Sequence, residues 1–178
     1  AGVSWAPAAG MGPSGTFNRV EIGVAPATPA TVYLSVDHLS QQSTSGQIWK
    51  SVDGGQSYAL VRTTGHLSSQ GWYDNTIWVD PTNSDRVVAA GVNAYRSTDG
   101  FATNQTQLSG IHTDFHLFVS DPGYNGTTNK RVYIGNDGGV FKNDDITTGS
   151  TFVSLNNNLG ITQFYGAGGN TTLSLIHI

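Results

Sequence analysis

The sequence predicts an all-β protein built from repeated four-stranded antiparallel units, and three observations support this prediction. Gly is frequent, at 23 of 178 residues, and Ser, Thr and Asn are plentiful, a composition that disfavours helices and suits short strands joined by tight turns. Short apolar runs that end in proline recur along the chain. A motif of an aromatic residue, a basic residue, Ser or Asn, any residue and Asp occurs three times at a spacing of 46 residues.

The repeated motif sets the length of the unit. Its copies are WKSVD at 49–53, YRSTD at 95–99 and FKNDD at 141–145. A period of this length is typical of repeat architectures and suits one four-stranded blade of a β-propeller. A β-sandwich needs no such regular period, and a β-solenoid uses shorter coils. We therefore predict a β-propeller fold with about three antiparallel blades of an incomplete ring.

Four strands are expected in the same order in each unit. The first is an apolar run that ends at Pro26, Pro81 or Pro122, because proline cannot donate to a strand ladder. The second is a shorter run, the third contains the aromatic–basic motif, and the fourth follows it. The first unit carries extra residues, 37–47, which we interpret as a long polar loop. The blades are expected at 17–64, 74–109 and 115–156 within a propeller domain of 1–172.

Both ends of the sequence indicate an incomplete ring. The segments 1–5 and 161–170 resemble single strands of neighbouring blades, and propellers usually have about 4–8 blades. Missing blades of the same chain are therefore expected as partners of these three. The last residues, LSLIHI at 173–178, break the pattern and match the translation of a nucleotide string that resembles a transposon end used in sequencing libraries. We expect this tail to be non-native and assign no function to it.

Charge and composition exclude several classes of function. The net charge is −4, and the five Arg and three Lys are scattered singly, so nucleic acid is not an expected partner. No apolar run is long enough to span a membrane. The chain has no Cys, which excludes disulfides. No cofactor is expected.

The first copy of the motif continues into a glycine-rich turn, SVDGGQSY at 51–58. The second copy keeps Ser97 and Asp99 but has Phe101 where a glycine is expected, and the third, at 141–145, is degenerate. The first copy matches the pattern Ser-x-Asp-x-Gly-x-x-aromatic, known as the Asp-box, at every position: Ser51, Asp53, Gly55 and Tyr58.

On these residues the chain resembles the Asp-box (BNR-like) repeat propellers of the sialidase-, sortilin- and xyloglucanase-like group. The resemblance implies the fold and says little about function. In those families the Asp-box joins the third and fourth strands, away from the active face. We interpret it as a structural corner, because Asp and Ser side chains accept local backbone N–H groups and Gly supplies a positive φ. The competing interpretation is a calcium or glycan contact.

Loops at the opposite face carry the candidate site residues. The segments 68–75 and 110–116 precede first strands, and 36–38 and 135–139 join second to third strands. Because first strands converge on the channel of a propeller, we expect these loops to lie close together there. The candidate ligand-binding residues are Gln70, Trp72, Tyr73, His112, His116 and Asn136.

Three aspartates at this face are candidate catalytic residues: Asp74, Asp114 and Asp137. Glycoside hydrolysis needs two carboxyl groups a few Å apart, and xyloglucanase-like enzymes use paired Asp. The alternative is a structural role in turns, which Asp137 in particular suits. In HTDFH, His112, Asp114 and His116 would share one face if extended and could then ligate a metal. We favour hydrogen-bonding residues at a channel mouth and predict no metal.

The sialidase-like members of this group bind a carboxylate with three Arg and use a Tyr–Glu pair, and the positions of Arg and Glu here do not match that pattern. We therefore expect a fragment of an exported bacterial Asp-box propeller, secreted or at the cell surface. Its expected role is to bind a glycan or a protein at the channel face. The alternative is a glycoside hydrolase that acts on a polysaccharide.

Overall fold

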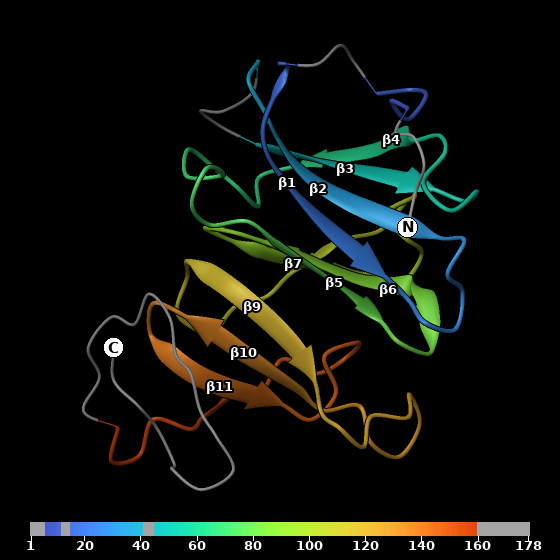
Figure 1. Cartoon of the computed structure of the whole chain (residues 1–178). Helices are drawn as coiled ribbons and strands as arrows, with labels where there is room; N and C mark the ends of the chain where they lie inside the picture. The colour runs from blue at the N-terminus through green and yellow to red at the C-terminus, as the bar shows by residue number, and fades with distance from the viewer. Residues whose placement is uncertain (1–5, 12–14, 41–44, 160–178) are drawn as a thin grey trace, which may run out of the picture.

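The computed structural model describes residues 6–11, 15–40 and 45–159, and within them lie three four-stranded antiparallel sheets (Figure 1). The prediction of an all-β fold with three four-stranded units is confirmed. Each sheet is a simple meander, because its strands are hydrogen-bonded in the order in which they follow in sequence. The expected strands at 1–5 and 161–170 and the tail at 173–178 fall outside the described residues.

The three sheets have the following strands. The first contains β1 (Phe17–Val24), β2 (Val32–His38), β3 (Gly46–Ser51) and β4 (Ala59–Thr64). The second contains β5 (Thr76–Asp80), β6 (Asn83–Ala90), β7 (Ala94–Ser97) and β8 (Thr106–Gln107). The third contains β9 (Phe115–Ser120), β10 (Val132–Asn136), β11 (Gly139–Asn143) and β12 (Val153–Ser154).

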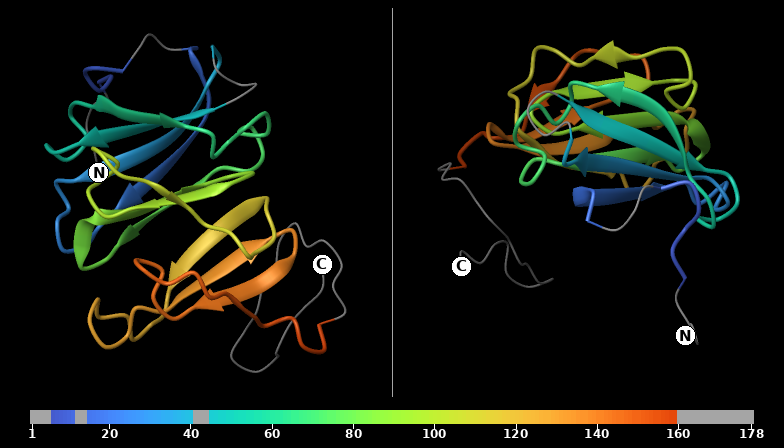
Figure 2. Two further views of the ribbon diagram at one scale, coloured as in Figure 1. Left: turned by 180° about the vertical axis from the view of Figure 1, so that it is seen from behind. Right: turned by 90° about the horizontal axis from the view of Figure 1, so that it is seen from above.

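The sheets lie side by side in chain order, as Figure 1 and the rear view in Figure 2 show, and the first strands of neighbouring sheets are adjacent. The alternation of side chains along β1 explains this contact, because alternate residues face the second sheet. Gly23 lies on that face, where an added Cβ would stand 2.8 Å from Val79 and 3.2 Å from Ile77 of β5. The absence of a side chain at Gly23 therefore lets β1 and β5 approach closely.

Apolar side chains fill the two spaces between the sheets. Between the first and second sheets the buried residues include Tyr33, Ile48, Val87 and Phe101. Between the second and third sheets the buried set is larger and contains Trp78, Val88, Ala90, Ala94, Leu108, Phe115, Phe118, Val132, Ile134 and Ile146. No helix in the part of the chain that the structure describes is long and apolar enough to cross a membrane.

The Asp-box corners follow the third strands and are closed by local hydrogen bonds. In the first corner Ser51 Oγ accepts from the backbone N of Gly55 at 2.9 Å, and Asp53 Oδ1 accepts from the N of Ser57 at 2.9 Å. In the second corner Ser97 Oγ accepts from the N of Phe101 at 2.8 Å. Phe101 has a φ of 66°, so it adopts the left-handed conformation that Gly55 adopts in the first corner, at 90°.

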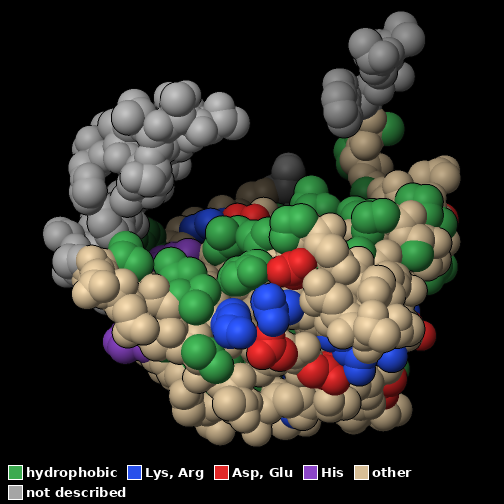
Figure 3. All heavy atoms as spheres, turned by 90° about the horizontal axis from the view of Figure 1, so that it is seen from below, with side chains coloured by type: hydrophobic (Ala, Val, Ile, Leu, Met, Phe, Trp, Pro, Cys, Tyr) green, Lys and Arg blue, Asp and Glu red, His purple; other side chains and the backbone are tan. Residues whose placement is uncertain are grey.

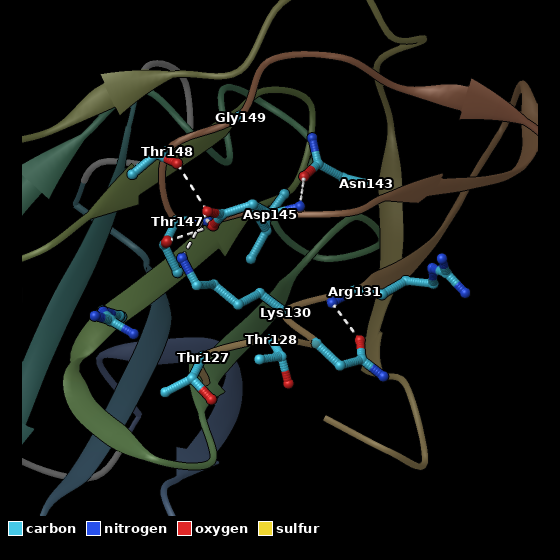
Figure 4. A network of polar contacts seen from close by, with 12 residues as sticks. Thr127, Thr128, Lys130, Arg131, Asn143, Asp145, Thr147, Thr148 and Gly149 are labelled. Atoms are coloured by element: carbon cyan, nitrogen blue, oxygen red, sulfur yellow. Dashed lines mark hydrogen bonds and ion pairs between the residues drawn. The ribbon is translucent and has the colours of Figure 1, made fainter. Parts of the chain in front are cut away.

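The degenerate third corner reaches a related arrangement with different side chains (Figure 4). The backbone N of Asp145 donates to Asn143 Oδ1 at 2.8 Å, and the N of Thr147 donates to Asp145 Oδ1 at 3.1 Å. Lys130 Nζ donates to the other carboxylate oxygen of Asp145 at 2.8 Å. An amide therefore replaces the serine hydroxyl, and the aspartate keeps its role as acceptor for the turn.

The second and third corners are each contacted by an arginine of the preceding sheet. Arg62 of β4 donates to the carbonyl oxygens of Phe101 and Ala102 in the second corner, at 2.9 and 3.4 Å. Arg96 of β7 donates in the third corner to the carbonyl oxygens of Ile146 and Thr148, at 3.2 and 2.9 Å, and to that of Gly149. These two corners therefore connect neighbouring sheets as well as neighbouring strands.

Candidate ligand site

A tight turn before β5 presents the aromatic residues of the candidate site. The carbonyl oxygen of Gln70 accepts from the backbone N of Tyr73 and of Asp74, both at 2.8 Å. This turn leaves Trp72 at the surface with 62% of the residue exposed, and the rings of Trp72 and Tyr73 lie 5.6 Å apart between centroids. The side chain of Gln70 is exposed, so the backbone of this residue accounts for its part in the turn.

A buried polar network holds this turn from below. Ser35 Oγ of β2 donates to Asn75 Oδ1 at 2.6 Å and lies 2.8 Å from His66 Nε2. Because the single hydroxyl proton is given to Asn75, we infer that His66 Nε2 carries a proton and donates to Ser35. Burial lowers the pKa of His66 to about 3, so the ring is neutral. No local pattern predicts this network, since its members are far apart in the chain.

His116 contacts two of the three candidate aspartates. This residue, the second of β9, has Nε2 at 2.7 Å from Asp137 Oδ1 and Nδ1 at 3.4 Å from Asp74 Oδ1. The ring of Tyr73 packs edge-on against the imidazole, with centroids 5.2 Å apart. Residues of three expected loops therefore meet at one imidazole, at the boundary between the second and third sheets.

Asp74 is the most perturbed carboxyl group of the site. It is 1% exposed, and its Oδ1 has no hydrogen-bond donor among the described residues. Burial raises the pKa of Asp74 to about 6; the field of His116 opposes this, and the carboxylates of Asp114 and Asp137 add to it. Asp74 is therefore half protonated near pH 6. In its ionised form it adds to the negative charge of Asp114 and Asp137.

Asp114 and Asn136 connect the loop before β9 to the turn between β10 and β11. Asp114 has a φ of 61°, and its carbonyl oxygen accepts from the backbone N of Asp137 at 3.1 Å. Asn136 Nδ2 donates to the carbonyl oxygen of His112 at 2.7 Å. These bonds position Asp137 opposite His116.

The metal geometry considered for HTDFH requires an extended segment, and the structure differs from this. β9 begins only at Phe115, and the positive φ of Asp114 turns the chain just before it. His112 is exposed, and its Nδ1 lies 2.9 Å from the carbonyl oxygen of Thr113. Among the described residues, no three His, Cys, Asp or Glu side chains are grouped so that they could hold a metal ion.

Arg19 supports the aromatic turn, and the sequence analysis did not assign it to the site. Its guanidinium group donates to the carbonyl oxygens of Trp72 and Tyr73, and its Nε donates to Glu21 Oε1 at 3.0 Å. Arg19 and Glu21 are two residues apart on β1 and so lie on the same face, toward the second sheet. The two-residue spacing of Arg19 and Glu21 predicts that they share a face of the strand. It does not predict that this face meets the aromatic turn, which depends on where the second sheet lies.

Comparison with known proteins gives structural likenesses alone. No family model matches the sequence, and no match was found among curated proteins. The structure is similar to a GH74 enzyme from Niastella koreensis, with a TM-score of 0.62 and 24% identity over 78% of this chain and 23% of that chain. It is also similar to the GH74 xyloglucanase from Xanthomonas campestris, with a TM-score of 0.60 and 16% identity over 83% of this chain and 24% of that one.

A third similar structure is YCF48 bound to a D1 peptide, with a TM-score of 0.44 and 15% identity over 83% of this chain and 46% of that chain. The chain spans about a quarter of the length of the two GH74 structures. At these identities the likeness concerns the fold. The three sheets are therefore blades of the β-propeller type, similar to part of the propellers of GH74 xyloglucanases.

Proposed function

We propose that the chain is part of an exported bacterial β-propeller and binds a glycan at the face formed by Trp72, Tyr73, His116 and Asp137. The observation that carries this proposal is the exposed indole of Trp72 beside a cluster of polar groups. An aromatic surface next to a few oriented hydrogen-bonding groups is typical of small-molecule and saccharide sites. The cell-surface or secreted setting belongs to the proposal and is checked by fractionation of the producing cells.

The contacts of the site favour binding over hydrolysis. In glycoside hydrolases the two carboxyl groups flank the scissile bond, about 5–9.5 Å apart. Here the imidazole of His116 lies between Asp74 and Asp137 and contacts both. A glycosidic bond cannot occupy that space unless His116 moves. The indole of Trp72 and the second carboxylate oxygen of Asp137 stay available to a ligand, since Trp72 is exposed and Asp137 is partly so.

A glycoside hydrolase is the second candidate, and the pKa of Asp74 favours it. A carboxyl group with a pKa near 6 can act as a general acid, and Asp137, hydrogen-bonded to His116, could act as its partner. In this case movement of His116 would open the space for the substrate. The fold likeness to a xyloglucanase makes xyloglucan the first polysaccharide to assay.

The binding proposal is tested by affinity electrophoresis and calorimetry of the intact chain with soluble polysaccharides, xyloglucan included. We expect Trp72→Ala to weaken binding at least about tenfold, since stacked aromatic rings supply about 0.5–1.5 kcal/mol or more beyond their buried area. Val52→Ala, at an apolar residue 71% exposed in the first corner, is the control and should bind normally. Equal binding by Trp72→Ala would refute the proposed site.

The same samples separate binding from hydrolysis. The hydrolase would be established if the chain releases reducing ends, Asp74→Asn abolishes this release and Trp72→Ala keeps part of it. Binding without release of reducing ends would leave the chain as a recognition module.

A further inference from the structure

The balance of charges around the candidate site is strongly negative. Asp74, Asp114 and Asp137 lie close enough for the other two to raise the pKa of Asp74. The imidazole of His116 is the only cationic or potentially cationic group that contacts these carboxylates among the described residues. Arg19 lies nearby, but its guanidinium group is held by Glu21 and by the carbonyl oxygens of the aromatic turn.

The other basic side chains have contacts elsewhere. All three lysines pair with other carboxylates: Lys50 with Asp85, Lys130 with Asp145 and Lys142 with Asp144. Two arginines, Arg62 and Arg96, donate to carbonyl oxygens in the corners between sheets. Two others, Arg86 and Arg131, pair with carboxylates. All Lys and Arg residues of the chain lie in the described part. Among the described residues, the three carboxylates of the site are therefore opposed only by His116, which contacts two of them, and by the more distant charge of Arg19, so the charge balance stays negative.

A buried oxygen atom indicates the same deficit independently of the count of charges. Asp74 is 1% exposed, and its Oδ1 has an ion-pair contact with His116 Nδ1 at 3.4 Å but no hydrogen-bond donor among the described residues. A buried carboxylate that lacks donors is costly. A cation bound near His116 would lower that cost through the field alone, because the interaction is strong at a partly desolvated site. Trp72 and Tyr73 also favour a cation, since an ammonium group is attracted to the face of an aromatic ring.

From these observations we infer that the ligand is a glycan that carries protonated amino groups, such as a polymer of glucosamine. This inference rests on the proposed glycan-binding function and names its ligand class. A sugar ring stacks on Trp72, and its ammonium group lies beside the carboxylates of Asp137 and Asp114. A neutral glycan gains only the stacking contact. An acidic glycan is repelled by the same carboxylates.

The test is calorimetric binding of four hexasaccharides to the intact chain at about pH 6.5, above the pKa of Asp74, with a repeat at about pH 8, where the sugar amino groups lose their charge. The probes are the glucosamine, N-acetylglucosamine, cellulose and galacturonate hexamers. We expect the glucosamine hexamer to bind at least about tenfold more tightly than the two neutral ones, and this advantage to shrink as salt is added. Asp137→Asn should reduce the affinity for the glucosamine hexamer to that for the neutral probes.

Two further variants guard the interpretation. Asp114→Asn repeats the removal of charge at a second position, and each variant is first checked for an unchanged thermal transition. Asp85→Asn removes a carboxylate whose partner is Lys50, on another part of the surface, and should leave binding unchanged.

The outcomes separate the inference from the function on which it rests. Equal affinity for the glucosamine and neutral hexamers overturns the inference and leaves glycan binding in place. Failure of all four hexamers to bind overturns both. Tighter binding of a lysine-rich peptide than of the glucosamine hexamer overturns the inference in favour of a protein ligand.

Discussion

Asp74 shows how one buried side chain couples stability to pH. Its pKa is about 6 in the folded chain because the carboxyl group is buried, and it has the ordinary value near 3.8 when unfolded. A raised pKa means that the folded chain takes up a proton more readily. The contribution to stability is therefore fully present below about pH 4 and is lost as the pH rises through about 6.

Asp74→Asn is expected to remove this pH dependence. Relative to the natural chain, the variant should gain stability as the pH rises from about 4 to 7, by up to about 3 kcal/mol for a shift of about two pKa units. Urea unfolding at both pH values measures the difference, and Asp85→Asn is the control. A difference in stability that stays constant with pH would contradict the assigned cause.

Single residues also show what the sequence could and could not predict. The 46-residue alignment placed Phe101 at the glycine position of the second Asp-box, and this residue does adopt a positive φ. The sequence could not predict why phenylalanine is tolerated there. The ring is fully buried between the first two sheets, so its packing offsets the strained backbone. The same argument applies to His66, whose burial follows from contacts that no local pattern encodes.

At the scale of elements, the corners bind one sheet to the next through arginine. Arg96 of β7 donates to three carbonyl oxygens of the third corner. Charge-assisted hydrogen bonds contribute more to stability than neutral ones. Removing the Arg96 guanidinium group would deprive all three carbonyl oxygens of their donor at once.

We expect Arg96→Met to lower the free energy of unfolding by about 2–3 kcal/mol, since it keeps the apolar stem and removes these bonds. Lys142→Met is the matched control, because Lys142 occupies the same repeat position one unit later and its ammonium group pairs with the exposed carboxylate of Asp144. Guanidinium chloride unfolding measures both. A loss as large for Lys142→Met as for Arg96→Met would show that the contact between sheets is not the cause.

The strands themselves could be predicted because their signals are local: apolar runs, closing prolines and the repeated motif. The candidate site could be predicted only as a set of loops. His116 meets Asp74 because β9 lies beside β5, and it meets Asp137 because β10 and β11 form a hairpin next to β9. The extended geometry in which His112 and His116 would share a face does not occur, because the chain turns at Asp114.

At the scale of the whole molecule, the outer faces of the first and third sheets remain apolar. On β1 the side chains of Val20, Ile22 and Val24 are exposed, and they lie in register with buried residues of β2. On the third sheet Leu117 and Val119 are exposed by 53% and 45%. Figure 3 views the molecule from below, the side of the third sheet, and shows hydrophobic side chains gathered beside basic and acidic ones.

Such faces are expected to associate in solution, since contiguous apolar patches mark interaction surfaces or aggregation sites. The double variant Leu117→Lys and Val119→Lys should lower concentration-dependent association in analytical ultracentrifugation. Val52→Lys, at an exposed position of the first corner, should not. The prediction fails if the natural chain and the double variant sediment alike at every concentration.

The contact between Asp74 and His116 crosses from the second repeat to the third, and this has a consequence for how such proteins diversify. Neither repeat contains the site, because each contributes one side of it. Each repeat carries one half of a site at its boundary with the preceding repeat and a different half at its boundary with the next. Duplicating a repeat therefore copies both halves and places them beside new neighbours. Rearranging the order of repeats would create new ligand sites without changing a single side chain.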